Sequence, residues 1–304
     1  MRILKWWSGL NTRIRVSLMM LLFLVVLSTV APFISPFRSD ELGVGPSLLH
    51  PTRTHPFGID SFGRDQFIRV TEGLRLSCFI GFTVMSTSLL IGIPIGILSG
   101  YKGGYLDTAF SRILDLLFAF PSLLLALVLV TILGTGFWTA LLALVIIYIP
   151  IASRFVRSAT LAEKDRDYIS AAKVNGASTF RICIKHILPN IASSLLVLGT
   201  NIFAFAILAE AALSYLGVGA KPPTPSLGKI LTENQGFITT SSHLVIIPAL
   251  TLSFVVLTLN LLGDGLRDYL DPKKTEKKSK QGRRRFPLMR KATNLSGTNI
   301  GAHQ

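Results

Sequence analysis

The chain has 304 residues, of which 50% are hydrophobic and only 15% are charged. Its mean hydropathy of +0.54 excludes a soluble globular domain of ordinary composition and indicates a membrane protein. The formal net charge is +15. Most of it is explained by Lys and Arg on the cytoplasmic side of the predicted spans, and nothing in the sequence specifies a nucleic-acid partner.

Uncharged runs long enough to cross ~30 Å of hydrocarbon as helices predict six membrane spans. In chain order they lie at residues 16–34 and 76–98, twice within 116–153, where Gly134-Thr135-Gly136 marks a hairpin, and at 191–209 and 244–263. Most Lys and Arg residues fall in segments that a cytoplasmic N-terminus would place inside. The expected fold is therefore all-α and polytopic, with both termini in the cytoplasm.

The first predicted span is a retained anchor, because its apolar run is longer than the core of a secretory signal. Residues 1–35 thus form an N-terminal cytoplasmic segment and the first span, and residues 36–73 an extracytoplasmic loop with a short helix at 64–70. His50 and His55 in this loop match no closed zinc pattern, so no metal site is expected. Residues 74–272 form a five-helix core, and the basic tail at 273–304 is expected to be disordered near anionic lipid headgroups.

Glycines and prolines punctuate the predicted spans. Gly92, Gly96 and Gly100 recur every four residues, so they share one helix face and allow either close helix packing or gating; tolerated glycines without a partner are the alternative. Prolines expected to bend their helices are Pro94, Pro121, Pro150 and Pro248.

Ionisable residues are scarce in the predicted spans. Glu210 lies near the outer boundary of the fifth span, where a structural or gating hydrogen-bond role is favoured over a proton relay. Asp107, Arg112 and Asp115 cluster at the inner edge of the third span. Arg112 and Asp115 are three residues apart, which predicts a structural ion pair on one helix surface.

The cytoplasmic loop at 154–190 is the longest polar segment between spans. Asp165 and Asp167 favour a helix start there, and Gly176 allows a turn. A second short helix is expected at 179–187, with Ile182, Ile184 and Ile187 toward the membrane, and Pro189 is expected to start the next span. Two short surface helices with a small-residue face directed outward follow from this pattern, although a generic interfacial helix would serve equally well.

This loop resembles the "EAA" loop of ATP-binding-cassette (ABC) importer permeases. The matching residues are Ala171-Ala172, Gly176 and His186-Ile187-Leu188-Pro189, with Ser170 in place of the family's first Glu. More specifically, the chain is similar to the C-type permease of dipeptide, oligopeptide and nickel importers. The supporting motifs occur in order: "HPFGIDSFGRD" (55–65), "GYKGGYLDTAFSRILDLLFAFPSLLLAL" (100–127), "EAALSYLGVGAKPPTPSLG" (210–228) and "NLLGDGLRDYLDP" (260–272).

The resemblance implies the type I ABC importer permease fold in a bacterial inner membrane. It also implies four kinds of partner: a homologous permease that completes a heterodimer, two ABC ATPase subunits that bind ATP and Mg²⁺, an extracytoplasmic binding protein, and membrane lipid. The implied ATPase-coupling residues are Ser170, Ala171, Ala172, Gly176 and Ala177, with Pro189 connecting them to the next span. The face that carries Gly92, Gly96 and Gly100 is the expected contact with the homologous permease.

The chain itself is not expected to be an enzyme. It contains no G-x-x-x-x-G-K-[ST] phosphate loop; the nearest candidate, Gly228-Lys229, is followed by Ile230. The resemblance favours transport of di- or oligopeptides, with nickel or a metal chelate as the alternative. A proton-coupled secondary transporter is disfavoured because Glu210 lies too far from the membrane midplane.

Overall fold

The computed structural model describes residues 11–270. It contains five helices long and apolar enough to cross a membrane, namely α2 (Thr12–Ile34), α3 (Gln66–Lys102), α6 (Phe137–Lys164), the continuous helix Thr179–Tyr215 and α11 (His243–Leu270). The all-α prediction is confirmed for these residues. The expectations for the first ten residues and for the tail at 273–304 concern segments outside the described residues.

The remaining predicted span is broken into two helices. α4 (Gly104–Phe118) and α5 (Ser122–Leu133) are bent by 87° across a short break, so the chain has six spans only if this bent pair counts as one. Pro121 occupies the residue immediately before α5. Since proline has no backbone N–H and constrains the residue before it, the helix cannot continue regularly through this point.

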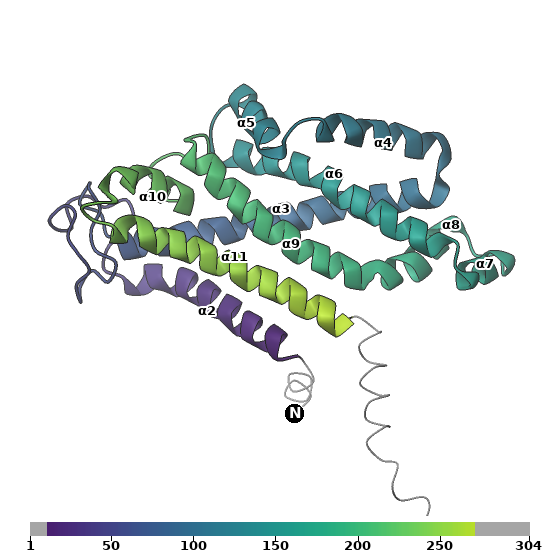
Figure 1. The fold of residues 1–304 in the computed structure, drawn as a ribbon, viewed down its shortest axis with the longest axis horizontal. Helices are drawn as coiled ribbons and strands as arrows, with labels where there is room; N and C mark the ends of the chain where they lie inside the picture. The colour runs from purple at the N-terminus through teal and green to yellow at the C-terminus, as the bar shows by residue number, and fades with distance from the viewer. Residues whose placement is uncertain (1–10, 271–304) are drawn as a thin grey trace, which may run out of the picture.

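The long helices form one bundle (Figure 1). α3 packs along α6 and the Thr179–Tyr215 helix, while α2 and α11 lie side by side along one edge. Arg13 near the start of α2 pairs with Asp268 near the end of α11 at 2.9 Å. This contact places the two ends of the described chain on the same side of the bundle, as two cytoplasmic termini require.

The segment between α2 and α3 is an ordered loop, as predicted, but the short helix expected at 64–70 does not exist separately. Its residues form the first turns of α3, which begins at Gln66. Asp65 caps this helix by accepting a hydrogen bond from the Ile68 backbone N–H at 3.0 Å. The helix therefore extends several turns beyond the apolar run by which the span was recognised.

Two short helices cover the same end of the bundle as this loop. α10 (Leu227–Asn234) packs against the last turns of the Thr179–Tyr215 helix, and η2 (Gln235–Phe237) leads toward α11. The approach is close at Gly228, where an added Cβ would lie 2.0 Å from the Ala211 carbonyl oxygen. Only glycine permits this contact between the two backbones.

Candidate functional site

The predicted coupling segment folds as a short helix followed by a tight turn. α7 (Asp167–Val174) follows α6 directly, and Asp167 lies in its first turn, where a negative charge complements the helix dipole. Gly176 has φ of +74°. The backbone N–H groups of Gly176 and Ala177 donate to the carbonyls of Lys173 and Ala172, each at 3.0 Å. These two bonds form a Schellman motif, the helix ending that favours glycine at this position.

One side of α7 packs against the chain's own core. Ile169 is fully buried in a cluster with Ile97, Val156 and Ile182, and Ala172 and Ala177 pack partly against this cluster. The expectation that the small residues form a single outward face is therefore wrong for Ala172 and Ala177. A helix of eight residues obtains its stability from such packing, which takes up one of its faces.

The opposite side of the segment is exposed. Ser170, Ala171 and Gly176 are all solvent-accessible, and the exposed side chains of Val174 and Phe180 retain 88% and 77% of their accessible area. Neither Val174 nor Phe180 was predicted from the sequence as a contact residue. Large apolar side chains in a polar cytoplasmic loop were the available signal, because apolar side chains that are exposed together on one short segment are typical of a contact with a partner.

Tyr168 connects α7 with both neighbouring long helices. Its hydroxyl donates to Glu163 of α6 at 2.5 Å and accepts from the side-chain amide of Asn190 at 3.1 Å. Desolvation together with the hydrogen bond to Glu163 raises the pKa of Tyr168 to about 12. The protonated hydroxyl joins α7 to both long helices through these two hydrogen bonds.

The expected second short helix is not separate from the next span. α8 (Thr179–Ile182), the π-helical segment η1 (Cys183–Ile187) and α9 (Leu188–Tyr215) run on as one helix, so Pro189 does not start it. The Leu188 N–H donates to the Cys183 carbonyl across a π turn. This wider turn accommodates the missing donor of Pro189 without a break.

The isoleucines of this segment do not all face the membrane, contrary to expectation. Ile182 and Ile187 are fully buried in the cluster beneath α7, and only Ile184 is exposed. The connection from α7 to α9 is therefore anchored to the core at Ile182, Cys183 and Ile187, while the residues between these positions are largely exposed. Together with the hydrogen bonds of Tyr168, these contacts join α7 to both long helices.

The two carboxylates of α4 pair with arginines of α6 and not with Arg112 of their own helix. Arg157 donates two hydrogen bonds to Asp107, with Nη2 to Oδ2 at 2.7 Å, and Arg154 Nη2 lies 2.9 Å from Asp115 Oδ1. Within the described part of the chain, Arg112 is not paired with Asp115, so the predicted pair is wrong. α4 runs beside α6 (Figure 1), so arginines of α6 lie within ion-pair distance of both carboxylates.

The glycine stripe of α3 packs against α6 of the same chain. An added Cβ would lie 2.7 Å from Ala152 Cβ at Gly92, 2.6 Å from the Ser153 carbonyl oxygen at Gly96, and 2.9 Å from the Arg157 carbonyl oxygen at Gly100. The face is fully occupied by this contact. The expectation that it meets a homologous permease is therefore wrong, whereas close helix packing is what the geometry allows.

Glu210 is buried where α3, α9 and α10 meet. Its carboxylate accepts hydrogen bonds from Ser77 of α3 at 3.0 Å and from Ser214 of α9 at 2.7 Å. These bonds satisfy both oxygens and connect two of the long helices. A gating role for Glu210 remains a prediction.

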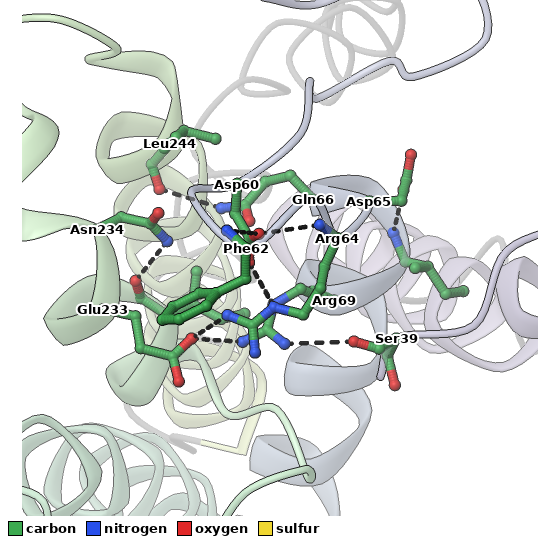
Figure 2. A network of polar contacts seen from close by, with 12 residues as sticks. Ser39, Asp60, Phe62, Arg64, Asp65, Gln66, Arg69, Glu233, Asn234 and Leu244 are labelled. Carbon is green, nitrogen blue, oxygen red and sulfur yellow. Dashed lines mark hydrogen bonds and ion pairs between the residues drawn. The ribbon is translucent and has the colours of Figure 1, made fainter. Parts of the chain in front are cut away.

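A buried ion network joins the loop at 36–65 to α3 and α10 (Figure 2). Glu233 of α10 accepts from both Arg64 and Arg69 at 2.7 Å, and Arg64 also donates to Asp60 at 2.7 Å. Arg69 donates further to the Ser39 carbonyl at 3.3 Å. No local pattern in the sequence indicates this network, because its members come from three separate segments.

Comparisons with known proteins agree with this architecture. The family model described as "binding-protein-dependent transport system inner membrane component" matches residues 92–276. The fold is also similar to that of the solved inward-facing methionine ABC transporter, with a TM-score of 0.56 at 22% identity, covering 66% of this chain and 96% of that one.

Two curated relatives match over most of their length. A dipeptide transport system permease of Haemophilus influenzae is 42% identical over 264 residues, covering 85% of this chain and 90% of the relative. A glutathione transport system permease of Escherichia coli is 41% identical over 258 residues, covering 83% and 84%. The matches place the chain in the bacterial inner membrane, with ATP hydrolysis in separate subunits. The chain belongs to the family of inner-membrane components of binding-protein-dependent transport systems.

Proposed function

We propose that this chain forms half of the passage of an ABC importer for di- or oligopeptides. A homologous permease supplies the other half, an extracytoplasmic binding protein delivers the peptide, and two ATPase subunits bind ATP and Mg²⁺ on the cytoplasmic side. The names of the dipeptide and glutathione permeases above favour a peptide substrate over nickel.

The observation that carries the coupling role is the construction of α7 and its turn. Val174 and Phe180 protrude from a segment whose other side is packed against the protein and whose ends continue into α6 and α9. A displacement of the ATPase bound at these side chains would move both long helices together. Such a displacement changes the passage only if the ATPase and the loaded binding protein prefer different states of the bundle.

Uptake measurements test the substrate. Membrane vesicles containing the complete transporter should accumulate a labelled dipeptide only with ATP, and unlabelled di- and oligopeptides should compete while nickel does not. Competition by nickel alone would favour the metal alternative. Uptake that persists without ATP but stops when the proton gradient is removed would contradict ABC transport altogether.

Cross-linking tests the ATPase contact. We expect a photoactivatable reagent attached to Val174→Cys to form a covalent product with an ATPase subunit, because this side chain projects away from the bundle. The same reagent at Leu22→Cys, on an exposed apolar face of α2, should give none. The native Cys78 and Cys183 are replaced in both variants. Failure at Val174 with intact assembly would contradict docking at α7.

Gly176→Val should impair coupled transport because it strains the backbone, not because the new side chain clashes with a neighbour. No atom lies within 4 Å of an added Cβ, but the residue has φ of +74°. A left-handed conformation costs a non-glycine residue about 1–2 kcal/mol, which lowers the equilibrium constant for forming the native turn by about 5–30-fold. We expect uptake to fall by no more than this factor while membrane insertion remains normal.

The matched control is Gly176→Asn, because asparagine tolerates the left-handed region. It should retain most of the transport activity. Equal loss in both variants would indicate that the ATPase surface requires the absence of a side chain. Normal uptake and normal coupling in Gly176→Val would contradict a role for this turn.

A further inference from the structure

The break between α4 and α5 exposes an unusual surface, here called the elbow (residues 118–121). Phe118 and Phe120 retain 40% and 55% of their accessible area, and Ala119 and Pro121 are exposed as well. α5 starts without a side-chain cap. The Ala119 N–H still donates to the carbonyls of Asp115 and Leu116, but the first backbone N–H groups of α5 and the carbonyls at the very end of α4 lack the partners that a continuous helix would supply.

The elbow lies within the thickness of the membrane-spanning bundle. α4 starts beside Lys102 at the inner end of α3, and its 15 residues extend for about 22 Å. Its Asp115 pairs with Arg154, which is 17 residues, or about 26 Å, from Phe137 at the outer end of α6. A hydrocarbon layer of ~30 Å placed on α6 therefore includes the level of the elbow.

Lipid is a poor neighbour for this surface. Irregular backbone at membrane depth is tolerated only where protein covers it or where it lines a water-filled cavity, because hydrocarbon offers no hydrogen-bond partner. In this respect the elbow differs from the exposed face of α2, where Leu22, Phe23 and Phe33 stand on unbroken helix. That face is suited to lipid, and the elbow is not.

An exposed ion pair next to the elbow leads to the same conclusion. The side chains of Asp115 and Arg154 are 62% and 50% accessible, and the Arg154 guanidinium lies 3.8 Å from the centre of the Phe118 ring. Arg154 was expected at the start of the cytoplasmic loop, but α6 continues beyond it to Lys164. Charged residues within spans face a bundle interior or an aqueous cavity, since their exposure to hydrocarbon is costly. Broken backbone and charge therefore mark the same side of the α4–α6 layer.

We propose that the elbow and the Asp115–Arg154 pair form the surface that meets the homologous permease, with the ion pair directed into the passage between the two subunits. This inference rests on the proposed half-channel function. The helices of a second permease would cover the broken backbone and the apolar rings. Water in the passage between the two subunits would solvate the ion pair. The tail at 273–304 is a poor occupant because its many Lys and Arg residues oppose entry into hydrocarbon.

The experiment uses the complete transporter reconstituted in lipid vesicles. Cys78 and Cys183 are replaced, Phe120→Cys is introduced, and a benzophenone reagent is attached and activated by light. We expect a covalent product whose peptides belong to this chain and to the second permease subunit. Leu22→Cys on α2 is the matched control and should give only lipid adducts. If Phe120→Cys fails to assemble, Leu124→Cys, which is also exposed at the start of α5, replaces it.

Lipid adducts alone at residue 120 would overturn the inference, as would a product that joins two copies of this chain. Peptide uptake and the Val174→Cys cross-link are measured in parallel on transporter whose elbow residues are unmodified. If both are normal while the elbow captures no second permease, the interface is wrong and the proposed function stands. If both are lost in the transporter with unmodified elbow residues, the proposed function itself fails.

Discussion

Replacing Glu233 by alanine is expected to lower the free energy of unfolding by about 3 kcal/mol, at the lower end of the range for breaking a buried ion pair. The variant removes the carboxylate shared by Arg64 and Arg69. Arg69 is only 1% exposed, so its guanidinium would remain buried with Asp60 as the nearest remaining carboxylate, at 3.5 Å. Thermal unfolding of the detergent-solubilised protein measures the loss.

Asp40→Ala is the matched control. It breaks the pair between Arg38 and Asp40 in the same loop, whose side chains are 81% and 40% accessible, and should cost about 0–1 kcal/mol. If the two variants were equally stable, the network in Figure 2 would have no role in holding the loop to α10.

Gly96→Val is expected to separate α3 from α6. Even a Cβ at this position would lie 2.6 Å from both the Ser153 carbonyl oxygen and Val156 Cβ. Overpacking of this kind costs about 3 kcal/mol when neighbouring backbone must move. We expect a lower unfolding temperature and a reduced yield of assembled transporter in the membrane, read by gel filtration of the solubilised complex.

Gly236→Val provides the comparison for Gly96, because no atom lies within 4 Å of a Cβ added at that position. It should leave stability and assembly close to those of the unaltered protein. If Gly96→Val had normal stability and lost only its association with the second permease, this result would instead support the original expectation that the glycine face contacts the homologous permease.

Local signals in the sequence were sufficient for much of the fold. Uncharged runs located the long helices, Pro121 lies at the break between α4 and α5, and the α7 turn at Gly176 follows from glycine's access to positive φ. Each of these features depends on a few consecutive residues. The start of α3 was misplaced because the uncharged run that defined the span begins only after Arg69 and its neighbouring charges, although a distant carboxylate pairs with Arg69 inside the fold.

The errors at the candidate site have a different origin. The pairing of Asp107 with Arg157 and the partial burial of Ala172 both depend on which helices become neighbours, and periodicity within one helix does not contain that information. The π turn at Cys183–Ile187 is a similar case, since a proline normally signals the end or beginning of a helix and not a wider turn within it.

The uninterrupted helix Thr179–Tyr215 has a mechanical consequence. Its 37 residues span about 55 Å, so a tilt of about 5° pivoting at the inner end would displace the outer end by about 5 Å at that length. At the outer end, the hydroxyl of Thr232 in α10 donates to the Tyr215 carbonyl at 2.7 Å, and α10 carries the glutamate that holds the outer loop. A tilt small enough to leave the inner end of this helix in place therefore produces a much larger displacement at the outer surface, where a binding protein would deliver the transported molecule.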